Sequence, residues 1–130
     1  MAFYLDTSAA VKLVVEEAET AALTAWINQS GVVLVASDLL RTELLRATRR
    51  AAPHAMTQAR DVLDSVLLLR IPPATFERAG ELAPDLLRSL DSIHLAAALE
   101  LDDELQGLIT YDDRLANAAR HHAINVITPT

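Results

Sequence analysis

The sequence contains no cysteine, only three glycines and no apolar run close to the length of a membrane-spanning helix. Without cysteine there are no disulfides and no thiolate metal ligands, which is compatible with a reducing cytoplasm. None of the glycines lies in a phosphate-cradling loop, which excludes a P-loop or a dinucleotide site. A helix that crosses a bilayer needs about 20 apolar residues, so no membrane segment is expected. No basic segment precedes an apolar one at the N-terminus, so we expect no signal peptide and a cytoplasmic protein.

Positive charge is also scarce, because 18 acidic residues outnumber 11 basic ones and the net charge is −7. A protein that binds nucleic acid mainly through its charge should be basic, so a long electrostatic footprint on DNA is not expected. The acids could form an ordinary solvated surface, or several could gather at a site that holds cations. Apolar residues make up 52% of the 130 residues, which predicts a single globular domain over residues 1–130.

Short apolar runs alternate with helical patterns along the chain. Strands are predicted over residues 2–5, 32–36, 67–71, 107–111 and 125–127. Helices are predicted from the residues after Asp6 and over residues 19–29, 38–51, 56–66, 75–82, 89–99 and 115–122. Hydroxyl or carboxylate side chains could cap three of these helices, namely Thr7 or Ser8, Ser37 or Asp38, and Ser89. The alternation predicts an α/β fold of three layers, with a central parallel sheet of about five strands flanked by helices.

Four acids fall where such a sheet would bring them to one edge. Asp6 and Asp112 follow predicted strands, Asp91 lies in the first turn of a helix and Glu43 lies in the second turn of another. In parallel βα units, the carboxyl ends of the strands and the amino ends of the following helices share one edge of the sheet. Convergence into one pocket further requires adjacent strands, which the sequence pattern leaves open.

Electrostatics limits what a pocket with four carboxylates can be. Two carboxylates about 5 Å apart repel each other by roughly 3 kcal/mol at an effective dielectric constant near 20. A helix amino end offsets only about 0.3–1 kcal/mol, so such a site must take up protons or a hard divalent cation. Oxygen ligands favour Mg²⁺ or Mn²⁺ over zinc, and a cation on carboxylates with open positions is suited to phosphodiester hydrolysis.

Four segments carry a family resemblance: Leu5-Asp6-Thr7-Ser8, the mid-helix Glu43, the segment from Ser89 to Ala96, and the segment from Thr110 to Leu115. In this order they resemble the PIN-domain ribonucleases, in particular the VapC toxins of bacterial type II toxin–antitoxin systems. The resemblance covers essentially the whole chain. It implies a Mg²⁺- or Mn²⁺-dependent endoribonuclease that cleaves RNA such as tRNA or rRNA, forms a homodimer and is inhibited by a VapB-type antitoxin.

The resemblance also implies a role for each acid. Asp6 and Asp91 would be direct metal ligands, and Asp112 would hold the metal or its water. Glu43 would complete the catalytic set and orient the nucleophilic water. Two hydroxyl residues match positions that support these acids, Ser8 and Thr110.

Each acid also has an ordinary structural alternative. Asp6 could cap a helix, Asp91 could interact with a helix dipole, and Asp112 could start a helix. Glu43 could form a surface ion pair with Arg46 or Arg50, which otherwise could reach RNA phosphate beside the metal. The histidine one turn after Asp91, His94, is predicted to have a polar or packed role, and Trp26 is predicted to pack in the core or at an interface.

Two other functions compete with the nuclease. The first is a PIN-fold interaction module without catalysis, against which the intact set of acids argues. The second is an aspartyl phosphatase or phosphoacceptor domain. A phosphatase would need a second Asp where Ser8 stands, and a phosphoacceptor domain would need a lysine after a late strand, whereas the only lysine is Lys12.

Overall fold

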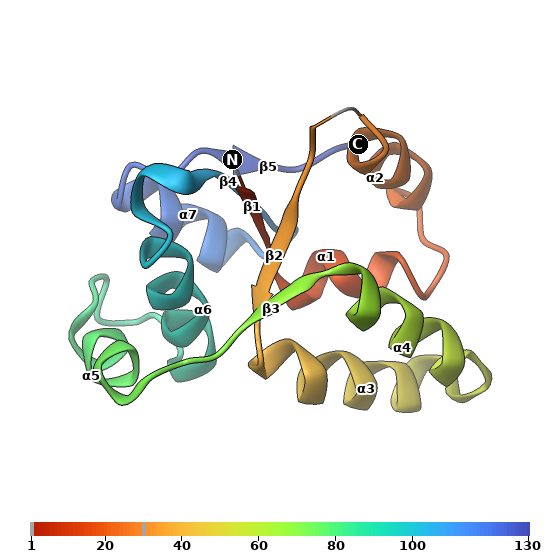
Figure 1. Cartoon of the computed structure of the whole chain (residues 1–130), viewed down its shortest axis with the longest axis horizontal. Coiled ribbons are helices and arrows are strands. Elements are labelled where there is room, and N and C mark those ends of the chain that lie inside the picture. Colours follow the sequence, from red (N-terminus) through yellow and green to blue (C-terminus); the bar gives the residue numbers. More distant parts are fainter. Residues whose placement is uncertain (1, 30) are drawn as a thin grey trace.

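A computed structural model describes residues 2–29 and 31–130, so Met1, with which the predicted domain begins, lies outside the described residues. Five parallel strands form one sheet in the order β3-β2-β1-β4-β5 (Figure 1). The strands are β1 (Ala2–Leu5), β2 (Leu34–Ser37), β3 (Leu67–Leu69), β4 (Leu105–Ile109) and β5 (Val126–Ile127). The predicted α/β fold with a five-stranded parallel sheet is therefore confirmed.

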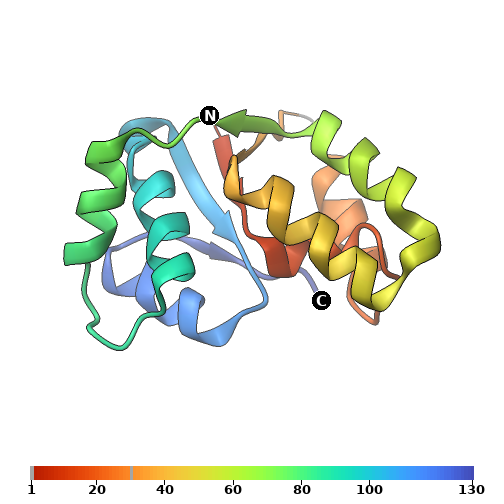
Figure 2. The same ribbon diagram turned by 90° about the horizontal axis from the view of Figure 1, so that it is seen from below.

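Helices cover both faces of the sheet, and Figures 1 and 2 show them as two groups on its opposite sides. One group comprises α1 (Thr7–Lys12), α2 (Thr20–Ile27), α3 (Leu39–Ala51) and α4 (Met56–Ser65). The other comprises α5 (Pro73–Glu81), α6 (Ser89–Leu99) and α7 (Asp113–His121). Two short 3₁₀ helices complete the described structure, η1 (Pro53–Ala55) and η2 (Asp102–Glu104).

Each group of helices buries its own half of the core against the sheet. Leu5, Ala36 and Ile109 point from the strands towards α1, α3 and α4. Tyr4 and Leu108 point to the opposite face, where α6 and α7 pack. Side chains alternate between the faces along a strand, so each central strand must be apolar on both sides, which explains its continuous apolar sequence.

The chain changes direction across the sheet at β1. It proceeds from β1 to β2 and β3 on one side, and then returns to add β4 and β5 on the other. Leu5 at the end of β1 pairs with Ile109 at the end of β4, so the residues that follow these two strands lie next to each other. Ligand sites of open α/β sheets form beyond the carboxyl ends of strands at such a change of direction.

Four of the five strands have bounds other than those predicted, and the last of them, predicted over 125–127, spans Val126–Ile127. The strand predicted over residues 32–36 begins at Leu34 and extends to Ser37, the one predicted over 67–71 ends at Leu69, and the one predicted over 107–111 spans Leu105–Ile109. β4 ends at Ile109, opposite the last residue of β1, whereas β2 begins opposite Phe3 and β3 ends at Leu69, opposite the last residue of β2. An apolar run in the sequence shows what can be buried but does not show how long its partner strand is.

The helix caps also differ from the prediction. Asp6 itself, rather than Thr7 or Ser8, is the N-cap of α1. Asp38 precedes α3 without a capping hydrogen bond, and its Oδ1 accepts a hydrogen bond from the Arg41 side chain. Ser89 is the first residue of α6, and Arg88 precedes it without a side-chain cap. Within the described part of the chain, no helix combines the length and the apolar character needed to cross a membrane.

Candidate functional site

Asp6 is the most constrained of the four predicted acids. It follows β1, is only 4% exposed, and its Oδ2 accepts hydrogen bonds from the Ser8 hydroxyl at 2.7 Å and the Thr110 hydroxyl at 2.9 Å. The Ser8 backbone N–H adds a capping bond at 3.3 Å. A buried carboxylate is costly unless hydrogen bonds compensate it, and three donors do so here.

Ser8 and Thr110 also join the ends of β1 and β4. The Ser8 hydroxyl accepts a hydrogen bond from the backbone N–H of Tyr111 at 2.9 Å, and the Thr110 hydroxyl accepts one from that of Asp112 at 3.1 Å. The two hydroxyl oxygens are 3.2 Å apart. The pair therefore holds Asp6 and the segment that leads to Asp112 in one arrangement.

Asp112 is the N-cap of α7. Its Oδ1 accepts hydrogen bonds from the backbone N–H groups of Arg114 at 2.9 Å and Leu115 at 3.2 Å. Asp6 therefore caps a helix and Asp112 starts one, as their structural alternatives predicted. Capping uses only one oxygen of each carboxylate, so it does not prevent the other oxygen from binding a ligand.

Glu43 lies on α3 and contacts residues of two other helices. Its Oε1 accepts a hydrogen bond from the Thr7 hydroxyl at 2.9 Å and lies 2.5 Å from Nε2 of His94 on α6. Burial by itself would raise the pKa of Glu43, but the hydrogen bonds from His94 and Thr7 and the charge of His94 hold it below its ordinary value. Glu43 is therefore an ionised hydrogen-bond acceptor.

Arg46 and Arg50 do not neutralise Glu43. Both are exposed, and neither forms an ion pair with Glu43 among residues 2–29 and 31–130. The alternative in which Glu43 serves a surface ion pair with an arginine is therefore wrong. Glu43 pairs with His94 instead.

Asp91 is half-buried in the first turn of α6, and the charges of the other three acids affect its pKa. Burial raises the pKa of Asp91, and the negative charges of Asp112 and Asp6 raise it further. Glu43 acts in the same direction, whereas His94 opposes it. Four acids from four distant segments thus lie close enough to influence one another at the carboxyl edge of the sheet, and we call them the four-acid set.

The four-acid set has the donor chemistry that Mg²⁺ or Mn²⁺ prefers, namely carboxylate oxygens that repel one another. Within the described residues, no hydrogen bond reaches either oxygen of Asp91, Oδ1 of Asp6 or Oδ2 of Asp112. In the same part of the chain, no three His, Asp or Glu side chains are already arranged around one point as metal ligands. The donors fit a hard cation, and the metal-binding and catalytic roles of the set remain predictions.

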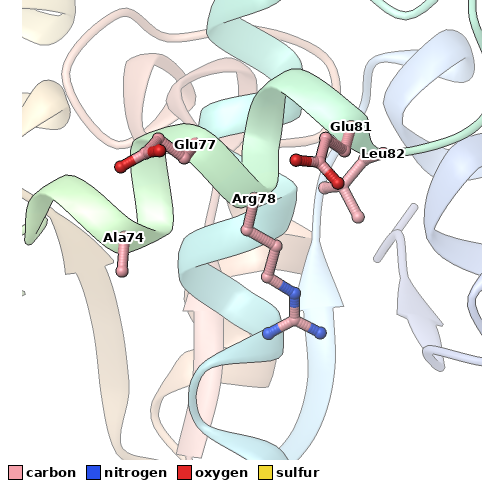
Figure 3. A pocket seen from close by; sticks show the side chains of 5 residues that line it. All are labelled: Ala74, Glu77, Arg78, Glu81 and Leu82. Carbon is pink, nitrogen blue, oxygen red and sulfur yellow. The ribbon is translucent and has the colours of Figure 1, made fainter.

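One surface hollow lies away from the four-acid set. This hollow is shown in Figure 3 and is lined by Ala74, Glu77, Arg78, Glu81 and Leu82, which belong to α5 and the residue that follows it. Arg78 is paired there with Glu100 at 3.1 Å. No member of the four-acid set lines this hollow, so it is not the predicted site.

Tyr4 and Thr7 were not predicted to lie at the site, and His94 was predicted to have only a general polar or packed role. His94 is 1% exposed, and its Nδ1 lies 2.8 Å from the Tyr4 hydroxyl. Burial by itself would lower the pKa of His94, but Glu43 and the charges of Asp6 and Asp91 raise it above its ordinary value. Two signals were available in the sequence, since Thr7 directly follows Asp6 and His94 stands one helical turn after Asp91.

Residues 3–121 match the model of the PIN domain family. Two relatives from Mycobacterium tuberculosis extend the similarity over nearly the full length. The chain is 41% identical to Ribonuclease VapC46, covering 99% of this chain and 98% of that protein. It is 37% identical to Ribonuclease VapC47, covering 97% and 96%.

Solved structures share the fold at low sequence identity. VapC20 of Mycobacterium tuberculosis, a toxin that cleaves the sarcin–ricin loop, superposes with a TM-score of 0.72 at 16% identity, covering 89% of this chain and 94% of that chain. VapBC2 of Rickettsia felis, solved bound to a DNA fragment from its promoter, has a TM-score of 0.73 at 13% identity and full coverage of both chains. These likenesses establish the arrangement of helices and strands.

Proposed function

Because the chain belongs to the PIN domain family and is a full-length relative of the VapC ribonucleases, we propose that it is the toxin of a VapB–VapC-type pair, a metal-dependent endoribonuclease that cleaves RNA. One observation carries the proposal beyond family membership. Asp91 is half-buried, which raises its pKa, and the negative charges of Asp112, Asp6 and Glu43 raise it further. A fold of marginal stability keeps such repulsion where a function requires it.

Asp6, Asp91 and Asp112 would hold Mg²⁺, or Mn²⁺ in its place. When bound, the cation makes water a stronger nucleophile at neutral pH and stabilises negative charge on the phosphate. Ser8 and Thr110 hold one oxygen of Asp6, which leaves the other for the cation. Asp112 is fixed in the same way by the backbone of α7.

Glu43 would orient the attacking water. Its Oε1 is already occupied by Thr7 and His94, so Oε2 is the oxygen that remains for water. Because the pKa of Glu43 is held low, its carboxylate is ionised and accepts a proton or hydrogen bond at neutral pH. Exposed Arg46 and Arg50, three and seven residues further along α3, would bind RNA phosphate.

The partners follow from the same family membership. We propose inhibition by a cognate VapB-type antitoxin, a homodimeric assembly, a cytoplasmic location, and an RNA substrate such as tRNA or rRNA. With a net charge of −7 the protein lacks a broad basic surface, so we expect it to recognise a short exposed loop of RNA rather than a long duplex.

The test is cleavage of total RNA by purified, antitoxin-free protein with Mg²⁺ or Mn²⁺. We expect discrete RNA fragments, loss of cleavage in EDTA, and loss of at least about 100-fold in rate for Asp6→Asn and Asp91→Asn, because each change removes a negative ligand. Asp113→Asn is the matched control, since Asp113 is exposed, belongs to the same sheet edge and lies outside the four-acid set.

Three results would contradict the proposal: no cleavage of any RNA, cleavage that persists in EDTA, or cleavage that persists in Asp6→Asn and Asp91→Asn. An equal loss in Asp113→Asn would show that the effect is one of general charge. Sequencing of the fragment ends then identifies the RNA and the position of the cut.

A further inference from the structure

His94 is buried deeper than any member of the four-acid set, yet it contacts one of them. It is 1% exposed on α6 and lies between Tyr4 of β1 and Glu43 of α3. A buried imidazole on an apolar helix face is costly unless both nitrogens have partners. Here both have them, with Nδ1 2.8 Å from the Tyr4 hydroxyl and Nε2 2.5 Å from Glu43 Oε1.

The direction of the hydrogen bond to Glu43 follows from the chemistry of the acceptor. An ionised carboxylate only accepts, so Nε2 must carry the proton and donate it to Oε1. The Tyr4 hydroxyl can donate to Nδ1 or accept from it, so it completes the chain in either charge state of the imidazole. The arrangement Tyr4–His94–Glu43 therefore does not depend on whether His94 is neutral or charged.

Two donors on one oxygen fix the orientation of the Glu43 carboxylate. Thr7 donates to Oε1 from α1 at 2.9 Å, and His94 donates to the same oxygen from α6. Glutamate has three rotatable side-chain bonds, so a carboxylate at the open edge of a sheet would otherwise sample several positions. No hydrogen bond among residues 2–29 and 31–130 reaches Oε2, so the same contacts leave that oxygen available.

We propose that His94 is a positioning residue: supported by Tyr4, it donates from Nε2 to Glu43 Oε1 and thereby fixes Oε2 for the reaction. This inference rests on the proposed nuclease function for its consequence in catalysis. Under this proposal α6 contributes two residues to the active site, Asp91 in its first turn and His94 on its buried face. A residue that acts in this way affects the rate of the chemical step and not the binding of RNA.

The kinetics of His94 variants, alone and combined with a Glu43 variant, test the proposal. His94→Leu fills the space without a donor, and we expect its kcat to fall about 10- to 100-fold with KM for RNA unchanged. His94→Gln can place an N–H near the position of Nε2, so it should recover most of that loss. In a Glu43→Gln background, His94→Leu should cause no further loss, because His94 acts only through Glu43. His54→Gln, an exposed histidine on η1, is the control and should match the wild type.

A readout independent of activity comes from the metal-free protein. With ¹⁵N-labelled histidine we expect one slowly exchanging, low-field Nε2–H proton signal, as charge-assisted hydrogen bonds give. It should move upfield or vanish in Glu43→Gln and persist in His54→Gln. In urea unfolding, the shifts in midpoint for His94→Leu and Glu43→Gln should sum to more than the shift of the double variant.

The outcomes separate this proposal from the nuclease proposal. If the wild type cleaves no RNA, the nuclease assignment fails, and the proton signal and the urea cycle still decide whether His94 and Glu43 are coupled. The positioning role is overturned if His94→Leu keeps kcat within about twofold of the wild type. It is also overturned if the losses from His94→Leu and Glu43→Gln multiply, or if the low-field signal is absent.

Discussion

At the scale of single residues, Asp91 combines a proposed metal-binding role with an unfavourable electrostatic position. Asp91 lies at a helix amino end, where a carboxylate gains about 0.3–1 kcal/mol, but it also faces three other negative charges. Burial is the main cause of a pKa above the ordinary value, and these charges raise it further.

The raised pKa of Asp91 predicts how stability depends on pH. Between the ordinary pKa of Asp91 and its raised value, the folded protein binds more protons at this group than the unfolded chain does. The contribution of Asp91 to the free energy of unfolding therefore falls as pH rises through this window. Above the window the full repulsion is present.

We accordingly expect Asp91→Asn to leave the free energy of unfolding of the metal-free protein at pH 7 unchanged, or to raise it by up to about 1 kcal/mol. Urea titrations of the wild type and the variant at several pH values from 4 to 7 measure the difference, with Asp113→Asn as the control. A loss of about 1 kcal/mol or more at pH 7, the usual effect of removing a helix cap, would instead show that Asp91 has a structural role.

The residues that bear charge could be predicted from the sequence, whereas their partners could not. Asp6 and Asp91 stand out because one follows a strand and the other begins a helix, which are local features of the chain. The contact between Tyr4 and His94 joins residues 90 positions apart, and that between Glu43 and His94 joins residues 51 apart. A periodic pattern within one helix or strand cannot predict a contact between residues so far apart in the sequence.

At the scale of elements, β4 and α7 meet at a carboxylate with two tasks. Asp112 closes the amino end of α7 with one oxygen, through hydrogen bonds to two backbone N–H groups. In the proposed function its other oxygen faces the cation. Asparagine and aspartate are almost equivalent as helix caps, but asparagine lacks the charge that a cation needs.

The two tasks of Asp112 can therefore be separated by a pair of substitutions. We expect Asp112→Asn to retain the stability of the wild type but to lose RNA cleavage, whereas Asp112→Ala should lose cleavage and also about 0.5–2 kcal/mol of stability. Thermal unfolding and RNA cleavage of the same preparations measure both effects. Should the two variants prove equally stable, the cap contributes nothing, and should Asp112→Asn remain active, the charge is not required.

The lengths of elements depend on their neighbours more than on their own sequence. Val32 and Val33 have strong strand propensity, but they precede β2, and Val33 is 48% exposed. Thr110 and Tyr111 similarly follow β4, although they continue its apolar run. Thr110 and Tyr111 lie beyond Leu5, the last residue of β1, whereas Val33 lies opposite Ala2, where its carbonyl accepts a hydrogen bond from the Phe3 backbone N–H. The pattern predicted that these strands exist and are parallel, and only the sheet defines where they end.

At the scale of the whole molecule, the fold serves to bring four distant segments to one place. The set combines the end of β1, the second turn of α3, the first turn of α6 and the residues after β4. Because β1 lies between β2 and β4, the central position of β1 makes these segments neighbours. The unfolded chain has no such arrangement, so a cation that needs several of these acids at once binds the folded protein alone.

Selective binding of a cation to the folded protein has a measurable consequence. It stabilises the fold by RT ln(1 + [L]/Kd), which is about 2.7 kcal/mol when the free cation is at 100 times its dissociation constant. We expect the melting temperature of EDTA-treated protein to rise with added Mg²⁺ or Mn²⁺ and to continue rising with concentration. Asp6→Asn and Asp91→Asn should abolish most of this rise, and Asp113→Asn should retain it.

A net charge of −7 requires a control for general screening, because any salt reduces repulsion among surface acids. Matching the ionic strength with NaCl supplies it, since monovalent ions screen charge but do not replace a divalent ion at shared carboxylates. A rise that NaCl reproduces, or one that is equal in all four proteins, would show that the cation acts on the surface as a whole. A rise confined to the divalent ion and to proteins that retain Asp6 and Asp91 would locate the ion at the carboxyl edge of the sheet, where the proposed reaction needs it.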